Sequence, residues 1–230
     1  MTTTTTTKTT TLHDVAATGN IIELNALIMA GANVNTTDSN SWTPIYKAAY
    51  HGHADVVNAL IAAGADPNHA NSDGNTPLYW ATSNVHADVV NALITAGADT
   101  NHANSDDTPI NLATRNGYTD IVNALIAAGA DVNKSDNLGR TPISWAAYYG
   151  HLDVVNALIL AGANVNKSDN LDNTPISWAA YNGHDEIVNA LILAGADVNK
   201  ADNLDNTPIS WAAYYGHDEI VNALIAAGAK

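Results

Sequence analysis

The sequence predicts an all-α repeat solenoid, in which short helix-turn-helix units stack on one another and share a continuous core. The phrase TPISWAAYNGHDEIVNALILAGADVN (174–199) has the start and stop signals of two helices. Close copies recur along the chain at a step of 33 residues, as from Thr174 to Thr207. Each helix has only about two or three turns, too few to be stable alone in water. A fixed period of this length, built from units that need neighbours, is typical of solenoids.

The first helix of the phrase begins at Thr174 and Pro175. The threonine hydroxyl can accept a hydrogen bond from an unpaired N–H of the first turn, and proline at the first helical position loses no bond that it needs. Gly183 ends the helix because it takes the left-handed conformation at no steric cost. The apolar face consists of Ile176, Ala179 and Ala180.

The second helix follows at once. Asp185 and Glu186 lie where its first N–H groups are exposed, and their charge favours the positive end of the helix. Gly195 follows the last apolar turn and ends the helix. The apolar side consists of Ile187, Val188, Leu191 and Ile192.

The starts and ends of the copies keep this period along the chain, apart from one step of 32 residues between Gly97 and Thr108. The residues that match Thr174 are Thr43, Thr76, Thr108, Thr141 and Thr207, with a weaker match at Thr10. The residues that match Gly195 are Gly31, Gly64, Gly97, Gly129, Gly162 and Gly228.

The repeated phrase resembles the ankyrin repeat, whose pattern is TPLHxAAxxGHxxVVxxLLxxGADVN. Matches include TTLHDVAATGN (10–20), TPIYKAAYHGHADVVNALIAAGADPN (43–68) and TPISWAAYYGHLDVVNALILAGANVN (141–166). The resemblance implies an ankyrin-repeat stack of helix-turn-helix units joined by β-hairpin-like loops, with residues 1–9 as a disordered threonine-rich tail. The seven expected repeats of the domain at 10–230 are 10–37, 38–70, 71–103, 104–135, 136–168, 169–201 and 202–230.

Three places depart from the pattern. Repeat one has Asp14 and Glu23 where later copies have Trp and Val, as expected of a polar N-terminal cap. Val85 stands where every other copy has Gly, so its helix must end differently or with strain, and the next loop lacks one residue. The segment 83–108 is therefore either a loop region in which sequence changes are tolerated, or a bend or weak point of the stack. The last helix has no polar cap before Lys230, so we expect a longer native protein or an end that is exposed, frayed or paired.

The charge balance excludes some partners. Acidic residues outnumber basic ones 23 to 8, and the formal net charge is -15. Nucleic acid and anionic membranes are bound through clustered Lys and Arg, so neither is expected as a partner. Cysteine is absent, which excludes disulfides and thiolate chemistry. No apolar run reaches the length of a membrane span and the start has no signal-peptide region, so a cytoplasmic protein is expected rather than a secreted one.

No catalytic or metal site is expected. The chain has nine histidines, but the repeated His positions lie one repeat apart, roughly 8–10 Å, which is too far to share a metal ion. Asp185 and Glu186 are explained by the helix start, and no catalytic motif is present. We therefore predict a non-enzymatic protein without a cofactor. Asn35, Asn133 and Asn166 match the glycosylation pattern, but the resemblance implies that this loop Asn forms hydrogen bonds within its turn. Hydroxylation of that Asn, known in some ankyrin proteins, stays open.

The candidate partner-binding residues are the variable ones just before the turn Gly and at the loop tips, which line the concave groove in ankyrin proteins. Tyr and Leu recur there at one-repeat spacing, and Tyr gives a large contact area with little rotamer entropy to lose. Trp80, Trp145, Trp178 and Trp211 are instead expected mainly in the core, because an indole is usually largely buried. The candidates are Trp42, Tyr50, His51, Arg115, Leu138, Arg140, Tyr148, Tyr149, Leu171, Asn173, Tyr181, Asn182, Leu204, Asn206, Tyr214 and Tyr215.

The predicted function is non-enzymatic binding of a protein or peptide along the groove of repeats four to seven, through a neutral to basic docking face of the partner. The expected state is a monomer, with possible self-association through the last repeat. One alternative is a structural or self-associating scaffold. Another is the ankyrin part of a larger protein whose effector or catalytic domain is missing.

Overall fold

The computed structural model describes residues 10–104 and 107–230, so the tail expected at 1–9 lies outside the described residues. The chain divides into two compact units, Met1–Asp99 and Thr100–Lys230. In the described part the regular structure is entirely helical, as predicted, and its fourteen helices form seven consecutive pairs. The first unit holds α1 (Leu12–Thr18), α2 (Ile21–Met29), α3 (Pro44–His51), α4 (Ala54–Ala62), α5 (Pro77–Ser83) and α6 (Ala87–Thr95). The second holds α7 (Pro109–Arg115), α8 (Thr119–Ala127), α9 (Pro142–Tyr149), α10 (Leu152–Leu160), α11 (Pro175–Asn182), α12 (Asp185–Leu193), α13 (Pro208–Tyr215) and α14 (Asp218–Ala226).

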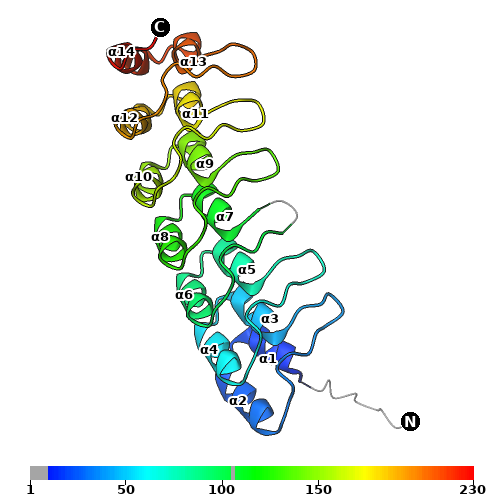
Figure 1. Cartoon of the computed structure of the whole chain (residues 1–230). Coiled ribbons are helices and arrows are strands. Elements are labelled where there is room, and N and C mark those ends of the chain that lie inside the picture. The colour runs from blue at the N-terminus through cyan, green and yellow to red at the C-terminus, as the bar shows by residue number, and fades with distance from the viewer. Residues whose placement is uncertain (1–9, 105–106) are drawn as a thin grey trace, which may run out of the picture. The chain divides into compact units, whose positions relative to one another are not determined.

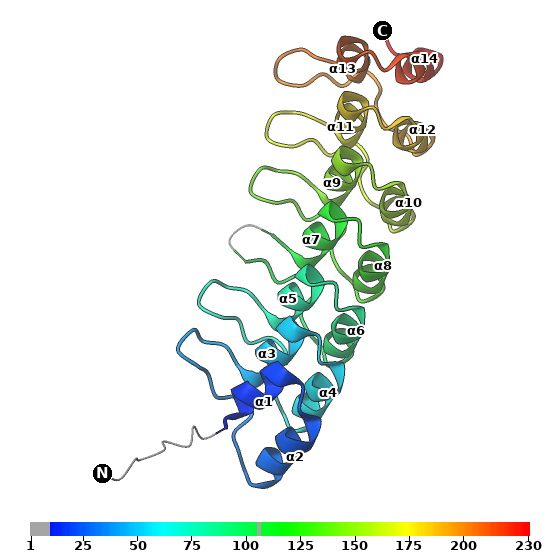
Figure 2. The ribbon, with the colours of Figure 1, turned by 180° about the vertical axis from the view of Figure 1, so that it is seen from behind.

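Each unit arranges its helices in two rows. In the first unit α1, α3 and α5 pack side by side, with α2, α4 and α6 as the second row. In the second unit α7, α9, α11 and α13 form one row, and α8, α10, α12 and α14 form the other (Figure 1). Figure 2 shows from behind that, in each unit, the long loops project on the side of the odd-numbered helices. We call the surface made by odd-numbered helices and these loops the odd-helix face.

The six odd-numbered helices from α3 onward have the predicted Thr at the N-cap and Pro at the first helical position, although the Thr141 and Thr207 hydroxyls accept no N–H of the first turn. The hydroxyl oxygen of Thr174 accepts the N–H of Ser177 at 3.4 Å, and Pro175 follows at the first helical position. The first helix differs from the expected alignment, because its cap is Thr11 and not Thr10. No proline follows Thr10, and Thr11 instead forms a reciprocal capping box with Asp14. The helix therefore starts one residue later than the repeat predicts.

The core of each unit lies between its two rows. In α9, Ile143 and Ala147 are fully buried, and they face Val155 and Leu158 of α10, which are equally buried. The same positions are buried in the interior helix pairs, whereas Leu27 of the first pair and Ile209 and Val221 of the last pair are only half-buried, and Ala213 is exposed. Burying one such Leu or Ile side chain contributes about 1.5–3 kcal/mol, which a single short helix cannot obtain alone.

The loops are closed like hairpins, although none of the described residues forms a regular strand. In the loop before α9, the N–H of Asp136 donates to the carbonyl of Arg140 at 3.0 Å. The Asp136 carboxylate also accepts the N–H groups of Leu138 and Arg140, both at 2.9 Å. The N–H of Asn170 in the next loop donates to the carbonyl of Leu138 at 3.0 Å. Neighbouring loops of the second unit are thus tied to one another.

A ladder of asparagine side chains joins each loop to the following repeat. The side-chain N–H of Asn166 donates to the carbonyl of Gly195 at 3.1 Å, and its oxygen accepts the N–H of Asp197 at 2.7 Å. Asn35 and Asn133 make the same pair of bonds. The expectation that these side chains bond within their own turn is therefore wrong. They bridge successive repeats, and this structural use accounts for the repeated Asn at the glycosylation-like triplets.

The repeated histidines form a second link between repeats. His184 is the residue that precedes α12, and its Nε2 lies 3.2 Å from the carbonyl oxygen of Tyr148, one repeat earlier. Because a carbonyl only accepts, Nε2 must carry the proton and donate it. The ring also covers Gly150, where an added Cβ would lie 2.7 Å from the His184 Cε1 atom. The turn glycine is therefore required both for its left-handed backbone and for the space that the ring fills.

Val85 occupies this glycine position in the first unit and takes φ 61°, so the strain expected from the sequence is present. The helix itself ends at Ser83 with Asn84 as its C-cap, and the left-handed residue comes one position later. The repeat that follows has Tyr118 where the other repeats after the first have His. The division between the two units, after Asp99, falls inside the irregular segment 83–108. The bend or weak point suggested for this segment stays a prediction.

Replacing Val85 by Gly should stabilise the protein by about 1 kcal/mol. A β-branched residue in the left-handed region costs about 1–3 kcal/mol, of which the greater backbone freedom of Gly in the unfolded chain offsets a part. Urea denaturation of the two proteins measures the difference. The matched reverse change, Gly52→Val, should destabilise by more than about 2 kcal/mol, because its Cβ would lie 2.6 Å from the His86 ring. A less stable Val85→Gly protein would contradict the assigned strain.

The asparagine ladder predicts a graded response at Asn166. Asn166→Ala loses two inter-repeat hydrogen bonds and should destabilise by about 2 kcal/mol, whereas Asn166→Asp keeps the acceptor for the Asp197 N–H and should lose about half as much. Chemical denaturation of both variants tests this order. Equal losses would show that the acceptor bond contributes nothing.

Candidate partner-binding surface

A row of alternating indole and phenol rings crosses the odd-helix face of the second unit. Tyr148 of α9 packs edge-on against Trp178 of α11, with ring centroids 5.2 Å apart. Tyr181 repeats this contact with Trp211 of α13 at 5.3 Å. Within α9 and α11 the steps are 6.3 Å, from Trp145 to Tyr148, and 6.0 Å, from Trp178 to Tyr181. The five rings therefore form one continuous aromatic row across three repeats.

The two tyrosine positions before the turn Gly are used differently. Tyr148 and Tyr181 are half-buried because the next repeat packs against them, whereas Tyr214 has no ring beyond it and is 77% exposed. The second position points outward. Tyr149 is 45% exposed and stacks on Trp145 of its own helix at 5.7 Å, with the ring planes 11° apart. The first position thus joins repeats, and the second adds exposed ring area to the same face.

Tyr215 takes the second position in the last repeat and is held from the side by Tyr181. The ring centroids are 4.6 Å apart, and the two hydroxyls are hydrogen-bonded. This hydrogen bond raises the pKa of the Tyr215 phenol to about 12, so the phenol stays protonated throughout the neutral range. The Tyr215 phenol is therefore a neutral group on this face.

The indoles of the row differ in their N–H partners. Trp178 donates its Nε1–H to Asp169 at 3.2 Å, and Trp211 donates equally to Asp202. In repeat five the corresponding carboxylate, Asp136, instead receives the Nε–H of Arg140 at 3.1 Å. The buried N–H of Trp145 has no acceptor among the described residues.

Trp145 gains cationic neighbours in place of an acceptor. The Arg140 guanidinium lies 3.8 Å from the centre of the Trp145 ring, and the Arg115 guanidinium lies 5.3 Å from it. Arg115 is fixed by an ion pair with Asp107 at 2.8 Å. Burial raises the pKa of the Asp107 carboxyl despite the opposing effect of Arg115. The repeat-five end of the row thus holds two guanidinium groups, each paired with an aspartate.

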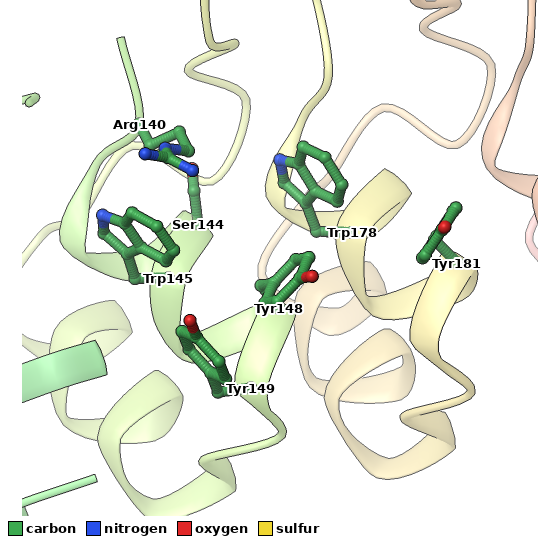
Figure 3. A pocket seen from close by; sticks show the side chains of 7 residues that line it. All are labelled: Arg140, Ser144, Trp145, Tyr148, Tyr149, Trp178 and Tyr181. Atoms are coloured by element: carbon green, nitrogen blue, oxygen red, sulfur yellow. The ribbon is translucent and has the colours of Figure 1, made fainter. Parts of the chain in front are cut away.

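Two adjacent pockets lie along the aromatic row. The first has a volume of about 370 Å³, and Figure 3 shows Trp145 and Arg140 on one side of it, Tyr148 in the middle and Trp178 and Tyr181 on the other side. Ser144 and Tyr149 complete its lining. The second pocket has a volume of about 220 Å³ and shares Trp178 and Tyr181 with the first. Its other lining residues are Leu171, Asn173, Ser177, Asp202, Asn203, Leu204 and Trp211.

The first unit has a smaller aromatic group of its own. Trp42 lies 5.6 Å from Tyr50, and Tyr50 lies 5.2 Å from Trp80. Below them Tyr46 is fully buried, and its hydroxyl accepts the side-chain N–H of Asn71 at 2.9 Å. Burial raises the pKa of Tyr46 well above its usual value. His51 is exposed beside Tyr50, with ring centroids 5.0 Å apart.

The remaining sequence candidates divide between surface and scaffold. Leu138, Leu171 and Leu204 are 55%, 55% and 74% exposed at the loop tips, and the last two line the second pocket. Asn173 and Asn206 instead donate to the carboxylates of Asp169 and Asp202. Asn182 donates to the Trp178 carbonyl within its own helix. The asparagines therefore mainly position the loops and rings.

The tryptophans were expected mainly in the core, and this is confirmed only for Trp145, which is 6% exposed. Trp178 and Trp211 are half-buried and line the pockets, together with Ser144 and Ser177, which were not predicted. Trp178 and Trp211 recur at one-repeat spacing, and each precedes a Tyr by three residues. This pattern could have predicted that the two indoles belong to the surface.

Within the residues that the structure describes, no group of three or more His, Asp or Glu side chains could hold a metal ion. In the same residues, no helix combines the length and apolar character needed to cross a membrane.

The model of ankyrin repeats, in three copies, matches residues 12–104, 100–169 and 160–230. These matches span nearly the whole chain, so the chain belongs to the ankyrin-repeat family, and its seven helix pairs fit seven repeats. Ankyrin repeat domains are protein–protein interaction modules and are generally non-catalytic.

Solved structures show the same architecture. The crystal structure of the human ASB11 ankyrin repeat domain is 28% identical, with a TM-score of 0.81 over 95% of this chain and 97% of that chain. The ankyrin repeat domain of Bcl-3, a unique member of the IkappaB protein family, is 25% identical, with a TM-score of 0.84 over 94% and 98%. No curated protein matches the chain.

The loop carboxylates predict a pH-dependent stability. Burial alone would raise the pKa of Asp202, but the N–H groups of Asn206, Leu204 and Trp211 outweigh it and lower the pKa below 3.8. A lowered folded-state pKa gives stability that is present above the unfolded pKa and is lost as the pH falls through the folded pKa. Asp202→Asn should therefore be less stable than the wild type near pH 7.

The deficit of Asp202→Asn should shrink as the pH falls below about 4, where the wild-type carboxylate also becomes protonated. Urea denaturation at several pH values measures it. The control is Asp205→Asn, an exposed carboxylate of the same loop, for which little change is expected at any pH. A deficit that stays constant down to about pH 2 would contradict the role given to the Asp202 charge.

Proposed function

We propose that the protein is a non-enzymatic interaction module that binds a protein or peptide along the odd-helix face of the second unit. The continuous aromatic row with its two adjacent pockets is the observation that carries this proposal. Aromatic residues are enriched at the centres of interfaces, where they provide much of the binding energy. Membership of a family of protein-binding modules supports the same conclusion.

The loop tips extend the proposed surface. Leu171 and Leu204 are exposed beside the second pocket, although a solvated loop does not require apolar side chains. The backbone bonds between neighbouring loops hold the tips in register, as with the 3.1 Å bond from the Asn203 N–H to the Leu171 carbonyl. A partner would therefore meet a preorganised surface and lose little affinity to ordering of the loops.

The partner's docking face is proposed to be neutral to basic. The chain has a formal net charge of -15, which favours association with a surface of opposite charge and slows association with an acidic one. The guanidinium groups of Arg140 and Arg115 on this face are each paired with an aspartate, so they add little net positive charge.

Replacing Tyr148, Tyr181 and Tyr214 by Ala should abolish capture of the partner, because it removes two rings of the row, which line the pockets, and the exposed Tyr214 ring of the same face. Affinity capture followed by mass spectrometry compares the triple variant with the wild type, and circular dichroism shows whether the fold is kept. The matched control replaces Leu160 and Leu193, which are 89% and 88% exposed on the even-numbered helices, by Ser.

The control should capture the same partners as the wild type. If the triple-Tyr variant folds and captures them too, the proposed surface is misplaced. If the leucine control loses them, binding depends on the even-helix side instead.

A further inference from the structure

We infer that the two pockets of the aromatic row recognise a proline-rich segment in the polyproline II conformation, with a Lys or Arg of that segment beside Asp205. Successive turns of the ligand would lie over the first and the second pocket, with Trp178 as the ridge between them. This inference rests on the proposed function and names the chemistry of the partner at that surface.

The spacing of the rings supports an extended ligand with a three-residue repeat. The steps from Trp178 to Tyr181 and from Tyr181 to Trp211 are 6.0 and 5.3 Å, so the two indoles lie at most about 11 Å apart. Stacked helices are generally about 8–10 Å apart. A polyproline II helix advances about 3.1 Å per residue with three residues per turn, so one turn covers about 9 Å. Prolines at every third position would therefore meet equivalent rings in successive repeats.

The shape of the site favours a chain over a small molecule. Pockets for small molecules usually measure about 300–1,000 Å³ and enclose most of the ligand. The second pocket, at about 220 Å³, is smaller than this, and it shares Trp178 and Tyr181 with the first. Two neighbouring hollows with a shared ridge suit the alternating side chains of a single extended segment.

The polar groups favour polyproline II over an α-helical ligand. A polyproline II segment has no internal hydrogen bonds, so its carbonyl groups need donors, whereas a helix satisfies its own backbone. Three tyrosines line the first pocket and Tyr181 also lines the second, and Figure 3 shows the Tyr148 hydroxyl on the side of the first pocket that faces Trp178 and Tyr181. Grooves lined by aromatic rings are a recurrent means of binding proline-rich segments, whose preformed conformation costs little entropy to bind.

Charge complementarity places the basic residue of the ligand. Asp205 is exposed at the loop tip next to Leu204, and the second pocket is also lined by the carboxylate of Asp202. At the other end of the row, Arg140 lies over Trp145 and lines the first pocket. A Lys or Arg of the ligand is therefore placed at the repeat-seven end, where Asp205 is exposed, and not at the repeat-five end, where Asp136 and Asp107 are already paired with arginines.

A fluorescence-anisotropy titration tests the inference with a labelled peptide that has proline at every third position and one Lys near an end. Three comparison peptides are used: one with the prolines replaced by Ala, one with Lys replaced by Glu, and an amphipathic helical peptide without proline. The protein variants are Trp178→Leu, which keeps an apolar side chain between the two pockets, and Asp205→Asn. Asparagine tolerates the left-handed backbone that residue 205 adopts. Leu193→Ala, on the even-helix side of repeat six, is the matched control.

The proline peptide should bind the wild type and Leu193→Ala equally, and Trp178→Leu about tenfold or more weakly, as expected of an aromatic residue central to binding. The alanine peptide should also bind at least about tenfold more weakly. Asp205→Asn should bind the proline peptide more weakly than the wild type does, and the wild type should bind the Lys-to-Glu peptide more weakly than the proline peptide. Added salt should weaken binding only where wild-type Asp205 is combined with the peptide that has Lys.

Binding of the alanine or the helical peptide as tightly as the proline peptide would overturn the inference. So would unchanged binding by Trp178→Leu, or no binding of the proline peptide to the folded wild type. The proposed function is tested separately by the triple-Tyr capture experiment. If that experiment succeeds and the proline peptide does not bind, the surface is right and only its ligand chemistry is wrong.

Discussion

The architecture depends on the bonds that join each repeat to the next. A single helix pair has about five turns in all and cannot bury enough apolar surface to be stable by itself. The Asn166 side chain and the His184 ring each reach backbone groups of an adjacent repeat, in opposite directions along the chain. These bonds fix how neighbouring repeats are aligned. Because the alignment is fixed, aromatic rings of successive repeats lie next to one another and form a continuous row.

The same constraint separates the positions that the scaffold needs from those that are free to vary. Gly150 cannot carry a side chain, because its backbone is left-handed and the His184 ring fills the space of a Cβ. The residues just before it, Tyr148 and Tyr149, meet no such requirement, since other repeats hold Arg115 and Asn116 there. Different side chains can therefore be placed at these positions without disturbing the turn. The aromatic row of the second unit consists largely of such positions and of the tryptophan one turn earlier.

In repeat five the aromatic surface includes a buried donor that lacks a hydrogen-bond acceptor among the described residues. In repeats six and seven the loop carboxylate accepts the indole N–H, whereas Arg140 takes that carboxylate in repeat five and leaves the buried N–H of Trp145 without an acceptor. An unsatisfied buried donor costs about 1–3 kcal/mol. The stacked guanidinium offsets part of this cost. The loop carboxylate of repeat five is thus neutralised by Arg140, whereas Asp205 is exposed at the repeat-seven end, so the two ends of the row differ in charge.

The sequence by itself determined the helix pairs, their caps, the repeat period and the aromatic positions, because short-range signals such as threonine-proline and the turn glycine act within a few residues. It placed the first cap one residue early, since Thr11 and Asp14 satisfy the helix start without proline. Only the tertiary structure decided that the loop asparagines bridge repeats, that Tyr148 packs on Trp178, and that half-buried tryptophans line the pockets. Each of these contacts joins residues about one repeat apart, and their distance in space depends on how neighbouring repeats dock.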